Sequence, residues 1–338
     1  MRRVRSDLAD LLVSRPVLLA DGATGTNFFQ MGLEAGEPPE FWNVHAPDKV
    51  ASLHQRFVDA GADIILTNTF GCNSYRLKLH NSADRVGELA KASAYVARGV
   101  ADAATRPVVV AGSVGPTGEL FAPLGALVHD DAVAAFREQI EGLLAGGADV
   151  AWIETMSAVE EIRAAAMAAI EVGMPYTATC SFDTAGRTMM GLLPSALGDV
   201  FADLPVQPVA YGANCGVGAP DILASLLEMT SADAGASTIC KGNCGIPSFQ
   251  GVDIVYSGTP ELMARYAALA IDAGARIVGG CCGTSPEHLA AMRVAIDAHT
   301  RGDRPDLDAI VANVGPLANA APGAATRESS RRASRRGR

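Results

Sequence analysis

Three cysteines are spaced as the ligands of one catalytic metal ion would be. Cys281 and Cys282 are adjacent within the run GGCCG, and Cys215 lies earlier, in the run NCG. Successive residues of a regular strand point to opposite faces, so both vicinal thiols reach one point only where the strand has ended. The flanking glycines permit such a turn. Three thiolates with an open fourth position suit catalytic zinc, whereas structural zinc has four protein ligands. We therefore predict Zn²⁺ on these three cysteines.

Zinc held by three thiolates would activate a thiol substrate. A free thiol with a pKa of about 8.5 is mostly protonated at neutral pH, and coordination to zinc removes its proton. Zinc with four thiolates has a formal charge of −2, so the bound sulfur stays electron-rich and can attack an activated methyl group. Hydrolytic zinc is usually bound by His and carboxylate ligands, but the six histidines include no recognisable ligand pair. The pattern predicts methyl transfer to a thiol.

Other interpretations of the cysteines stay open at the level of sequence. Each could be a buried small hydrophobic residue, and the vicinal pair could form a disulfide or help to bind an iron–sulfur cluster. Cys240 and Cys244 are a rival pair, although Cys240 lies in an apolar segment and is expected to pack there. Cys72 and Cys180 are expected to be structural. Seven cysteines without an export signal do not indicate a disulfide framework.

An amino-acid substrate would also need partners for its carboxylate and ammonium groups. The loop that begins at Asp21 can turn the backbone N–H groups of Gly22, Ala23 and Thr24 inward as an anion nest, although such a loop would also suit a phosphate. Glu154 ends an apolar segment, where a carboxylate is poorly placed for a core and well placed to pair with an ammonium. A salt bridge to a neighbouring helix is the alternative for Glu154. Asp21 could assist it or cap the turn.

The composition is that of a compact globular protein and does not favour nucleic-acid binding. Hydrophobic residues make up 49% of the 338 residues and charged residues 19%, so the chain can bury a large core. The net charge is −10, and aromatic residues, which stack bases, amount to 5%. Asp7 and Asp10 interrupt any signal-peptide core, and no run reaches the roughly 18 apolar residues of a membrane span. We expect a soluble, cytoplasmic protein without membrane partners.

Short apolar segments alternate with longer amphipathic, alanine-rich stretches, which is typical of βα units in a parallel sheet. The eight predicted strands are Val17–Ala20, Asp63–Thr67, Val108–Ser113, Asp149–Glu154, Tyr176–Ser181, Val209–Asn214, Ser237–Lys241 and Arg276–Gly280. A glycine at position 61, 147 or 274 ends the stretch before three of them, as a left-handed helix C-cap would. These units predict a single-domain α/β fold, a (β/α)₈ TIM barrel, with an open doubly wound sheet as the alternative.

Polar residues gather just after the predicted strands, which favours the barrel. Examples are DGATG at 21–25, NTF at 68–70 and GGCCGT at 279–284. In a (β/α)₈ barrel the carboxyl ends of all strands form one rim where active sites lie, so residues far apart in the chain converge there. The barrel is predicted over residues 1–300. Residues 301–338, with six arginines after residue 326, are predicted to be a largely disordered basic C-terminal tail.

These motifs resemble the homocysteine S-methyltransferase family, which includes betaine–homocysteine methyltransferases and the homocysteine domain of corrinoid-dependent methionine synthase. The similarity covers roughly residues 15–300, and the combination of NCG with GGCCG is its most specific part. The other matching motifs are DGA at 21–23, TNTF at 67–70, GPTG at 115–118 and ETM at 154–156. The resemblance implies methionine formation, with zinc on the three cysteines and homocysteine held near Glu154, Asp21 and the Gly22–Thr24 backbone.

The methyl donor is predicted to be betaine, because the full sequence resembles bacterial betaine–homocysteine methyltransferases. Trp42 could offer an aromatic face to the quaternary ammonium, or it could simply cover the barrel mouth. Asn243 is a second candidate donor-site residue. Gly71 stands where the animal betaine enzymes carry Tyr, and Cys244 where the family usually has Ala. The alternatives are S-methylmethionine, a methylcorrinoid on a separate protein, and a non-catalytic subunit that binds zinc or a thiol.

Overall fold

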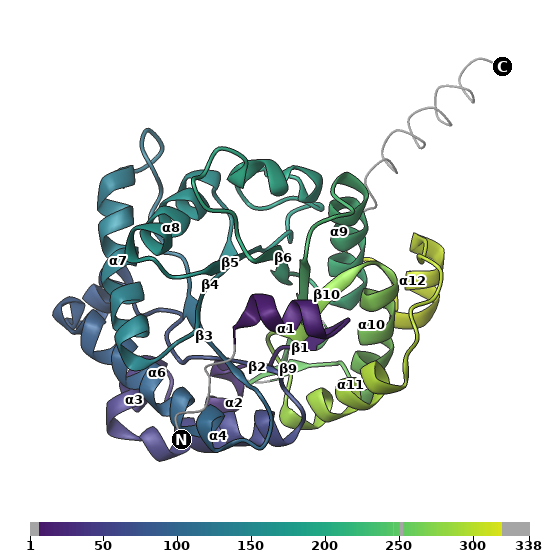
Figure 1. Cartoon of the computed structure of the whole chain (residues 1–338), viewed down its shortest axis with the longest axis horizontal. Coiled ribbons are helices and arrows are strands. Elements are labelled where there is room, and N and C mark those ends of the chain that lie inside the picture. The colour runs from purple at the N-terminus through teal and green to yellow at the C-terminus, as the bar shows by residue number, and fades with distance from the viewer. Residues whose placement is uncertain (1–6, 246, 251–252, 320–338) are drawn as a thin grey trace.

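Eight parallel strands follow one another around a single barrel (Figure 1). The computed structural model describes residues 7–245, 247–250 and 253–319. The barrel strands are β1 (Leu18–Leu19), β2 (Ile64–Leu66), β3 (Val109–Val114), β4 (Val150–Met156), β5 (Tyr176–Cys180), β6 (Ala210–Cys215), β7 (Thr238–Gly242) and β10 (Ala275–Gly280). Their order in the sheet is β1-β10-β7-β6-β5-β4-β3-β2. Each overlaps a segment predicted from the sequence, so all eight predicted strands are confirmed.

The sheet closes on itself between β1 and β2. Asp63 donates its main-chain N–H to the Leu19 carbonyl at 2.7 Å, and Asp21 donates to the Ile64 carbonyl at 3.0 Å. Ala20 and Ile64 form a parallel bridge at the same place. Closure removes the free edges that an open sheet would leave. The barrel prediction is confirmed, and the open doubly wound sheet is wrong.

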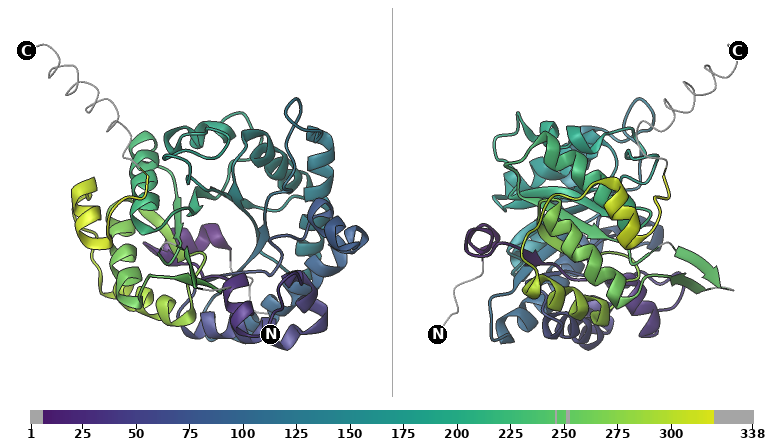
Figure 2. Two further views of the ribbon diagram at one scale, coloured as in Figure 1. Left: turned by 180° about the vertical axis from the view of Figure 1, so that it is seen from behind. Right: turned by 90° about the vertical axis from the view of Figure 1, so that its right-hand side faces the viewer.

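An outer ring of helices covers the strands (Figure 2). The long ones are α4 (Pro47–Asp59), α6 (Val86–Ala103), α7 (His129–Gly146), α8 (Val159–Val172), α9 (Ala219–Ala232), α10 (Pro260–Asp272) and α11 (Pro286–Ala298), and the short α2 (Gly25–Gln30), α3 (Trp42–His45) and α5 (Ser74–Leu77) lie in the first two loops. Two 3₁₀ turns, at 194–196 and 198–201, replace the helix of the fifth unit. Gly61, Gly147 and Gly274 have φ of 102°, 102° and 109°, the left-handed conformation predicted for them.

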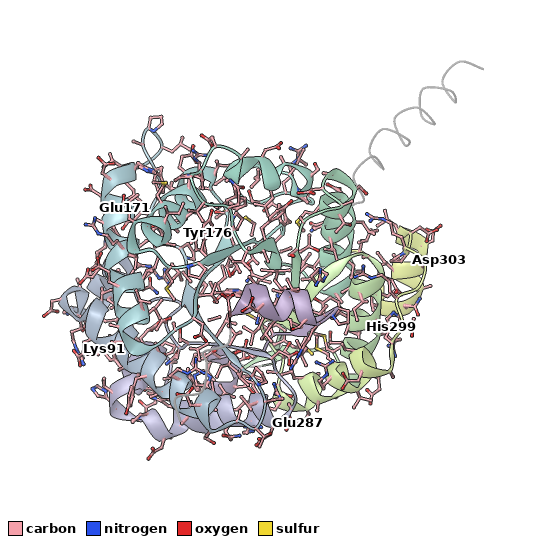
Figure 3. All side chains as sticks on the ribbon, viewed as in Figure 1. Lys91, Glu171, Tyr176, Glu287, His299 and Asp303 are labelled. Carbon is pink, nitrogen blue, oxygen red and sulfur yellow. The ribbon has the colours of Figure 1, made fainter. Side chains whose placement is uncertain are left out.

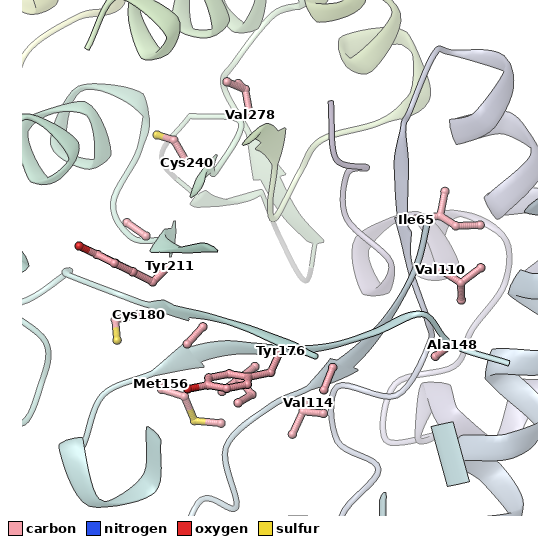
Figure 4. Close-up of a cluster of buried hydrophobic side chains, with 14 of the residues drawn as sticks. Ile65, Val110, Val114, Ala148, Met156, Tyr176, Cys180, Tyr211, Cys240 and Val278 are labelled. Atoms are coloured by element: carbon pink, nitrogen blue, oxygen red, sulfur yellow. The ribbon is translucent and has the colours of Figure 1, made fainter. Parts of the chain in front are cut away.

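Two apolar layers hold the barrel together. The inner layer fills the barrel with side chains such as Ile64, Val109 and Trp152, and helix α1 (Leu8–Ser14) closes its amino-terminal end with buried leucines. The outer layer lies between strands and helices, and Figure 4 shows part of it. Charged side chains lie on the outer helices, as Figure 3 shows for Lys91, Glu171 and Glu287. No helix in the described part of the chain is long and apolar enough to cross a membrane.

One buried carboxylate organises the amino-terminal end of the barrel. The Asp63 side chain, 3% exposed, binds the guanidinium groups of Arg15 at 2.6 Å, Arg106 at 3.4 Å and Arg293 at 3.2 Å. It also accepts a hydrogen bond from the Leu19 N–H at 3.0 Å. The carboxylate therefore joins α1, α11 and the seam between β1 and β2.

The C-terminal extension differs from its prediction between residues 301 and 319. Helix α12 (Leu307–Val314) buries Ile310 and Val314 and packs against α9 and α10. Ala318 and Asn319 donate their N–H groups to the Asp221 carboxylate, each at 2.8 Å. This part of the extension, predicted only to be largely disordered, is ordered because α12 has an apolar face that the barrel helices cover. The arginine-rich remainder, 320–338, lies outside the described residues. A hairpin of β8 (Pro247–Gln250) and β9 (Asp253–Tyr256), not predicted, projects on the side opposite α1 (Figure 2).

Candidate functional site

A cavity of about 530 Å³ opens at the carboxyl ends of the strands. Its wall contains all three predicted zinc ligands, the Glu154 side chain and residues 22–24. The structure thus brings together groups from β1, β4, β6 and β10 that are far apart in the chain. Asp21 lies beneath the wall and is 1% exposed.

The three thiols are close enough to share one metal ion. The sulfur atoms of Cys215, Cys281 and Cys282 all lie within 4.8 Å of one another, and those of Cys215 and Cys282 are 4.0 Å apart. A tetrahedral zinc with Zn–S distances of about 2.3 Å would separate its sulfurs by about 3.8 Å. Cys281 and Cys282 do not form a disulfide. The rival Cys240 and Cys244 are fully buried and lie outside this cluster.

Hydrogen bonds among the thiols give them different proton affinities. The pKa of Cys215 is raised because its thiol shares its proton with Cys281 and Cys282. The pKa of Cys282 is lowered because its sulfur accepts hydrogen bonds from Cys215 and Cys281. The cluster therefore already accommodates thiolate charge. A divalent cation would replace the shared protons and neutralise more of that charge.

A left-handed residue aims the first thiol at the others. Cys215 ends β6 with φ 61°, and Gly216 follows with φ 74°. A non-glycine residue in this conformation is strained, and such strain is held where surrounding structure requires it. The preceding Asn214 donates its amide N–H to the Thr155 hydroxyl at 2.7 Å and to the Cys281 sulfur at 3.8 Å. Asn214 thus links β4, β6 and the turn that carries Cys281.

Main-chain bonds fix the other two thiols in a turn after β10. Cys281 donates its N–H to the Gly242 carbonyl at 2.8 Å, and Cys282 donates its N–H to the Asn243 side chain at 3.0 Å. The amide N–H of Asn243 reaches the Gly216 carbonyl at 2.6 Å. Asn243 therefore ties the two cysteine loops together. It is not among the residues that line the cavity, so its prediction as a donor-site residue is corrected.

Sequence reasoning missed a tyrosine that covers this turn. The Tyr256 ring lies against Gly283, where a Cβ atom would come within 2.3 Å of it. Its phenol is hydrogen-bonded to Cys282. Tyr256 follows a segment without a recognisable motif, so no sequence pattern could have predicted this contact.

Glu154 is a buried carboxylate at the inner end of the cavity. It is 8% exposed, and its Oε1 accepts a short hydrogen bond from the Ser113 hydroxyl. Burial raises the pKa of Glu154 to about 7, against the opposing charge of Lys241. The alternative predicted for Glu154, a salt bridge to a neighbouring helix, is wrong, because no such ion pair is found in the described residues. The carboxylate is free to bind a cationic group of a ligand.

Asp21 and Lys241 form a buried ion pair below Glu154. The Lys241 ammonium lies 2.9 Å from Asp21 Oδ1 and 3.0 Å from the Asp21 carbonyl oxygen. The other carboxylate oxygen accepts the Leu66 N–H at 2.7 Å. Burial raises the pKa of Asp21, and Lys241 opposes the rise. In the following loop, Ala23 donates its N–H to the Thr284 carbonyl at 3.1 Å, so this donor is already used.

Trp42 does not reach the cavity. It is 4% exposed, its ring centroid lies 5.0 Å from that of Phe28, and the Lys49 ammonium lies 4.3 Å from its centroid. The prediction that it contacts a donor is corrected, because its helix α3 turns the indole into the core and one face is taken by lysine. The phenyl rings that line the cavity are those of Phe29, which the sequence analysis did not name, and Phe70, which it named only as part of a motif.

The comparisons with known proteins agree with this geometry. The family model described as Homocysteine S-methyltransferase matches residues 18–296. The methionine synthases of Mycobacterium leprae and Mycobacterium tuberculosis are each 32% identical, over 86% and 88% of this chain. The chain spans about a quarter of their length, 25% and 26%.

Solved structures agree on the fold. The oxidized form of the homocysteine methyltransferase MmuM from Escherichia coli has a TM-score of 0.72 and 24% identity, covering 86% of this chain and 99% of that one. Its metallated form has the same TM-score and identity, covering 84% and 98%. Because the family model matches nearly the whole barrel and relatives are 32% identical, this chain belongs to the homocysteine S-methyltransferase family.

Proposed function

We propose that this chain is a cytoplasmic enzyme that transfers a methyl group from betaine to the thiol of homocysteine, giving methionine and dimethylglycine. Zn²⁺ would be held by Cys215, Cys281 and Cys282. The observation that carries the proposal is the cluster of three thiols within 4.8 Å of one another in the wall of one cavity. Membership of the homocysteine S-methyltransferase family supports the acceptor.

The metal would supply one part of the chemistry. When bound, zinc deprotonates the homocysteine thiol and keeps its sulfur nucleophilic. As the new S–C bond forms, the C–N bond of betaine breaks and its electron pair stays on the nitrogen of dimethylglycine. The protein's own task is to place the sulfur and the methyl carbon in line and to exclude water from the closed end of the cavity.

The amino-acid end of homocysteine has partners on the chain. Glu154 would pair with the ammonium, since it is a buried carboxylate without a cationic partner at hydrogen-bond distance among the described residues. The carboxylate would bind the loop after Asp21. There the N–H groups of Gly22 and Thr24 make no hydrogen bond to another described residue, whereas that of Ala23 does. The nest therefore offers two donors.

The outer half of the cavity suits a cationic methyl donor. Its wall includes the rings of Phe29 and Phe70 and the carboxylates of Glu37 and Glu40. Aromatic faces and carboxylates both attract a quaternary ammonium. Glu40 accepts the Gly71 N–H at 2.7 Å, so it is fixed in place beside the loop that carries Phe70. We therefore assign to these residues the contact with the quaternary ammonium that the sequence analysis assigned to Trp42.

A methylcorrinoid on a separate protein is the second candidate donor. The observation that favours it is the group of exposed apolar side chains around the cavity mouth: Phe29 is 55% exposed, Phe70 42% and Leu79 66%. Leu120 and Leu124 in the loop after β3 are 51% and 71% exposed. Exposed apolar patches often mark protein-docking surfaces. The 32% identity to methionine synthases is compatible with this donor.

The deciding experiment is methionine formation by the purified, zinc-loaded chain with homocysteine and betaine and no other protein. Methionine appearing together with dimethylglycine would establish a self-contained betaine enzyme. Zinc-loaded protein that forms none would exclude betaine, and S-methylmethionine and a methylcorrinoid protein would be tested next. Binding of homocysteine without turnover on any donor would identify a non-catalytic subunit.

A further inference from the structure

One buried cation lines the same cavity as the three thiols. Lys241, on β7, is 2% exposed and pairs in register with Asn214 of β6 and Gly279 of β10. Cys215 follows Asn214 on one side, and Cys281 lies two residues beyond Gly279 on the other. Lys241 therefore lies within two residues of the strand ends that carry Cys215 and Cys281, and it shares their cavity.

The absence of a side chain at Gly279 leaves room for the Lys241 side chain. A Cβ atom on Gly279 would come within 2.9 Å of Lys241 Cγ and 3.0 Å of the Ala20 Cβ. Contacts under 3.0 Å force a neighbour to move. Glycine at this position thus lets the lysine cross from β7 to Asp21 at the end of β1. The same Asp21 carbonyl oxygen that binds the ammonium also accepts the Gly280 N–H at 3.1 Å.

The charges around the cavity are unequal. Among the described residues, the cavity wall contains two buried carboxylates, Glu40 and Glu154, three thiols and one ammonium, that of Lys241, which is paired with the buried Asp21. Arg76 and His80, the other basic residues in the cavity wall, are exposed to solvent. A fourth thiolate would leave a zinc centre with a formal charge of −2 in a place that solvent screens weakly. A fixed positive charge nearby would stabilise such a centre.

We propose that Lys241 is a positioning residue whose fixed positive charge balances the negative charge of the thiolate centre. This charge strengthens the binding of zinc and of homocysteine thiolate. The homocysteine part rests on the proposed function. The charge of Lys241 also acts on the cavity wall, since it opposes the rise in the pKa of Glu154 that burial causes. Asp21 would then have two roles. It neutralises the charge of Lys241 in the protein without zinc, and it orients the Lys241 ammonium.

The test removes the charge of Lys241 in a background in which Asp21 is already neutral. Lys241→Met alone would strand the Asp21 carboxylate and impair folding. We therefore compare Asp21→Asn with Asp21→Asn/Lys241→Met, whose buried pair is neutral. Zinc affinity is measured by chelator competition, and homocysteine and methionine affinities of the zinc-loaded proteins by calorimetry. Methionine is the control ligand, because it has the same amino-acid groups and no thiolate.

In the double variant we expect zinc and homocysteine to bind at least tenfold more weakly than in Asp21→Asn, while methionine affinity stays within twofold. Equal losses for homocysteine and methionine would overturn the inference, because they would show that Lys241 only supports the loop. Zinc and homocysteine affinities within twofold of Asp21→Asn would overturn it as well. If the wild-type protein binds zinc and not homocysteine, the proposed function fails, and the zinc measurement alone then decides the role of Lys241.

Discussion

Two buried carboxylates, one at each end of the barrel, differ in how completely they are paired. At the amino-terminal end, the Asp63 carboxylate is surrounded by three arginines and a main-chain N–H. At the carboxyl-terminal end, the buried Glu154 has no cation at hydrogen-bond distance, and burial raises its pKa to about 7. A paired carboxylate stabilises the fold, whereas an incompletely paired one is available to a ligand. The barrel thus separates stability from binding by position.

Backbone strain follows the same division. The non-glycine residues with positive φ include Thr155 and Cys215, both at the carboxyl ends of strands. At the amino-terminal end, the glycines that precede β2, β4 and β10 carry the positive φ values instead. Glycine adopts this conformation without a steric penalty, and Thr and Cys do not. Thr155 and Cys215 therefore carry backbone strain at two strand ends that line the cavity.

The largest effect should come from removing a thiol at the binding end. We expect Cys215→Ala to lose stoichiometric zinc and to reduce methionine formation below detection, because only two thiolates would remain for the metal. Metal content by mass spectrometry and product formation by chromatography measure this. Cys180→Ala, a buried thiol outside the cluster, is the control and should keep both. Full zinc and normal turnover in Cys215→Ala would contradict the proposed site.

At the other end, removing the paired carboxylate should damage stability and leave binding intact. Asp63→Ala leaves three arginines without their shared partner, so we expect the free energy of unfolding to fall by about 3–5 kcal/mol. Denaturant titration measures the loss. Homocysteine affinity of the folded fraction should stay within twofold of wild type. A large loss of affinity at unchanged stability would show that the two ends are coupled.

Glu154→Gln should separate substrate binding from metal binding. The ammonium of homocysteine would lose a charged partner worth about 1.5–3 kcal/mol, so its affinity should fall roughly 10- to 100-fold while zinc stays bound. Calorimetry and metal analysis report the two properties. Glu161→Gln is a matched control, since this buried carboxylate binds Thr117 and does not line the cavity. Unchanged homocysteine affinity in Glu154→Gln would assign Glu154 another role.

The pH dependence should carry the signature of Glu154. Because its pKa in the empty site is about 7, the carboxylate is mostly charged only above that pH, and the wild-type advantage over Glu154→Gln should shrink by up to about tenfold per unit below it. The folding stability of the protein without ligand depends on pH in the opposite sense. Because the pKa of Glu154 is higher in the folded state than in the unfolded state, its protonation stabilises the fold at low pH, and this contribution is lost as the pH rises from 4.5 through 7. Glu154→Gln should therefore gain stability relative to wild type at pH 8. If the differences in homocysteine affinity and in unfolding free energy between wild type and Glu154→Gln were constant from pH 6 to 8, both expectations would be wrong.

The smallest effect should come from Trp42. Trp42→Phe keeps an aromatic ring against Phe28 and removes part of a buried side chain, so we expect a loss of about 1 kcal/mol in unfolding free energy. The KM for the methyl donor should change less than twofold, since the indole does not line the cavity. Phe70→Ala is the comparison, and its donor KM should rise. A rise in donor KM confined to Trp42→Phe would restore Trp42 to the donor site.

Local sequence patterns were enough to predict the fold class and which cysteines come together at the cavity. Eight apolar segments with glycine caps specify βα units, because alternation of strands and helices is a local property of the chain. The barrel then sends every strand end to one rim, so the NCG and GGCCG motifs could be expected to meet. The glycines on both sides of Cys281 and Cys282 also set this pair apart from Cys180 and Cys240, which lie within apolar segments.

The contacts that each group near the cavity makes could not be predicted without the folded structure. The indole of Trp42 and the amide of Asn243 have suitable chemistry for a donor, but helix α3 buries the first and two main-chain groups occupy the second. In the sequence, Lys241 is an ordinary residue at the end of a predicted strand. Its ion pair with Asp21 joins two parts of the chain that are far apart in sequence. Side-chain direction and long-range pairing depend on the closure of the sheet, which no local pattern encodes.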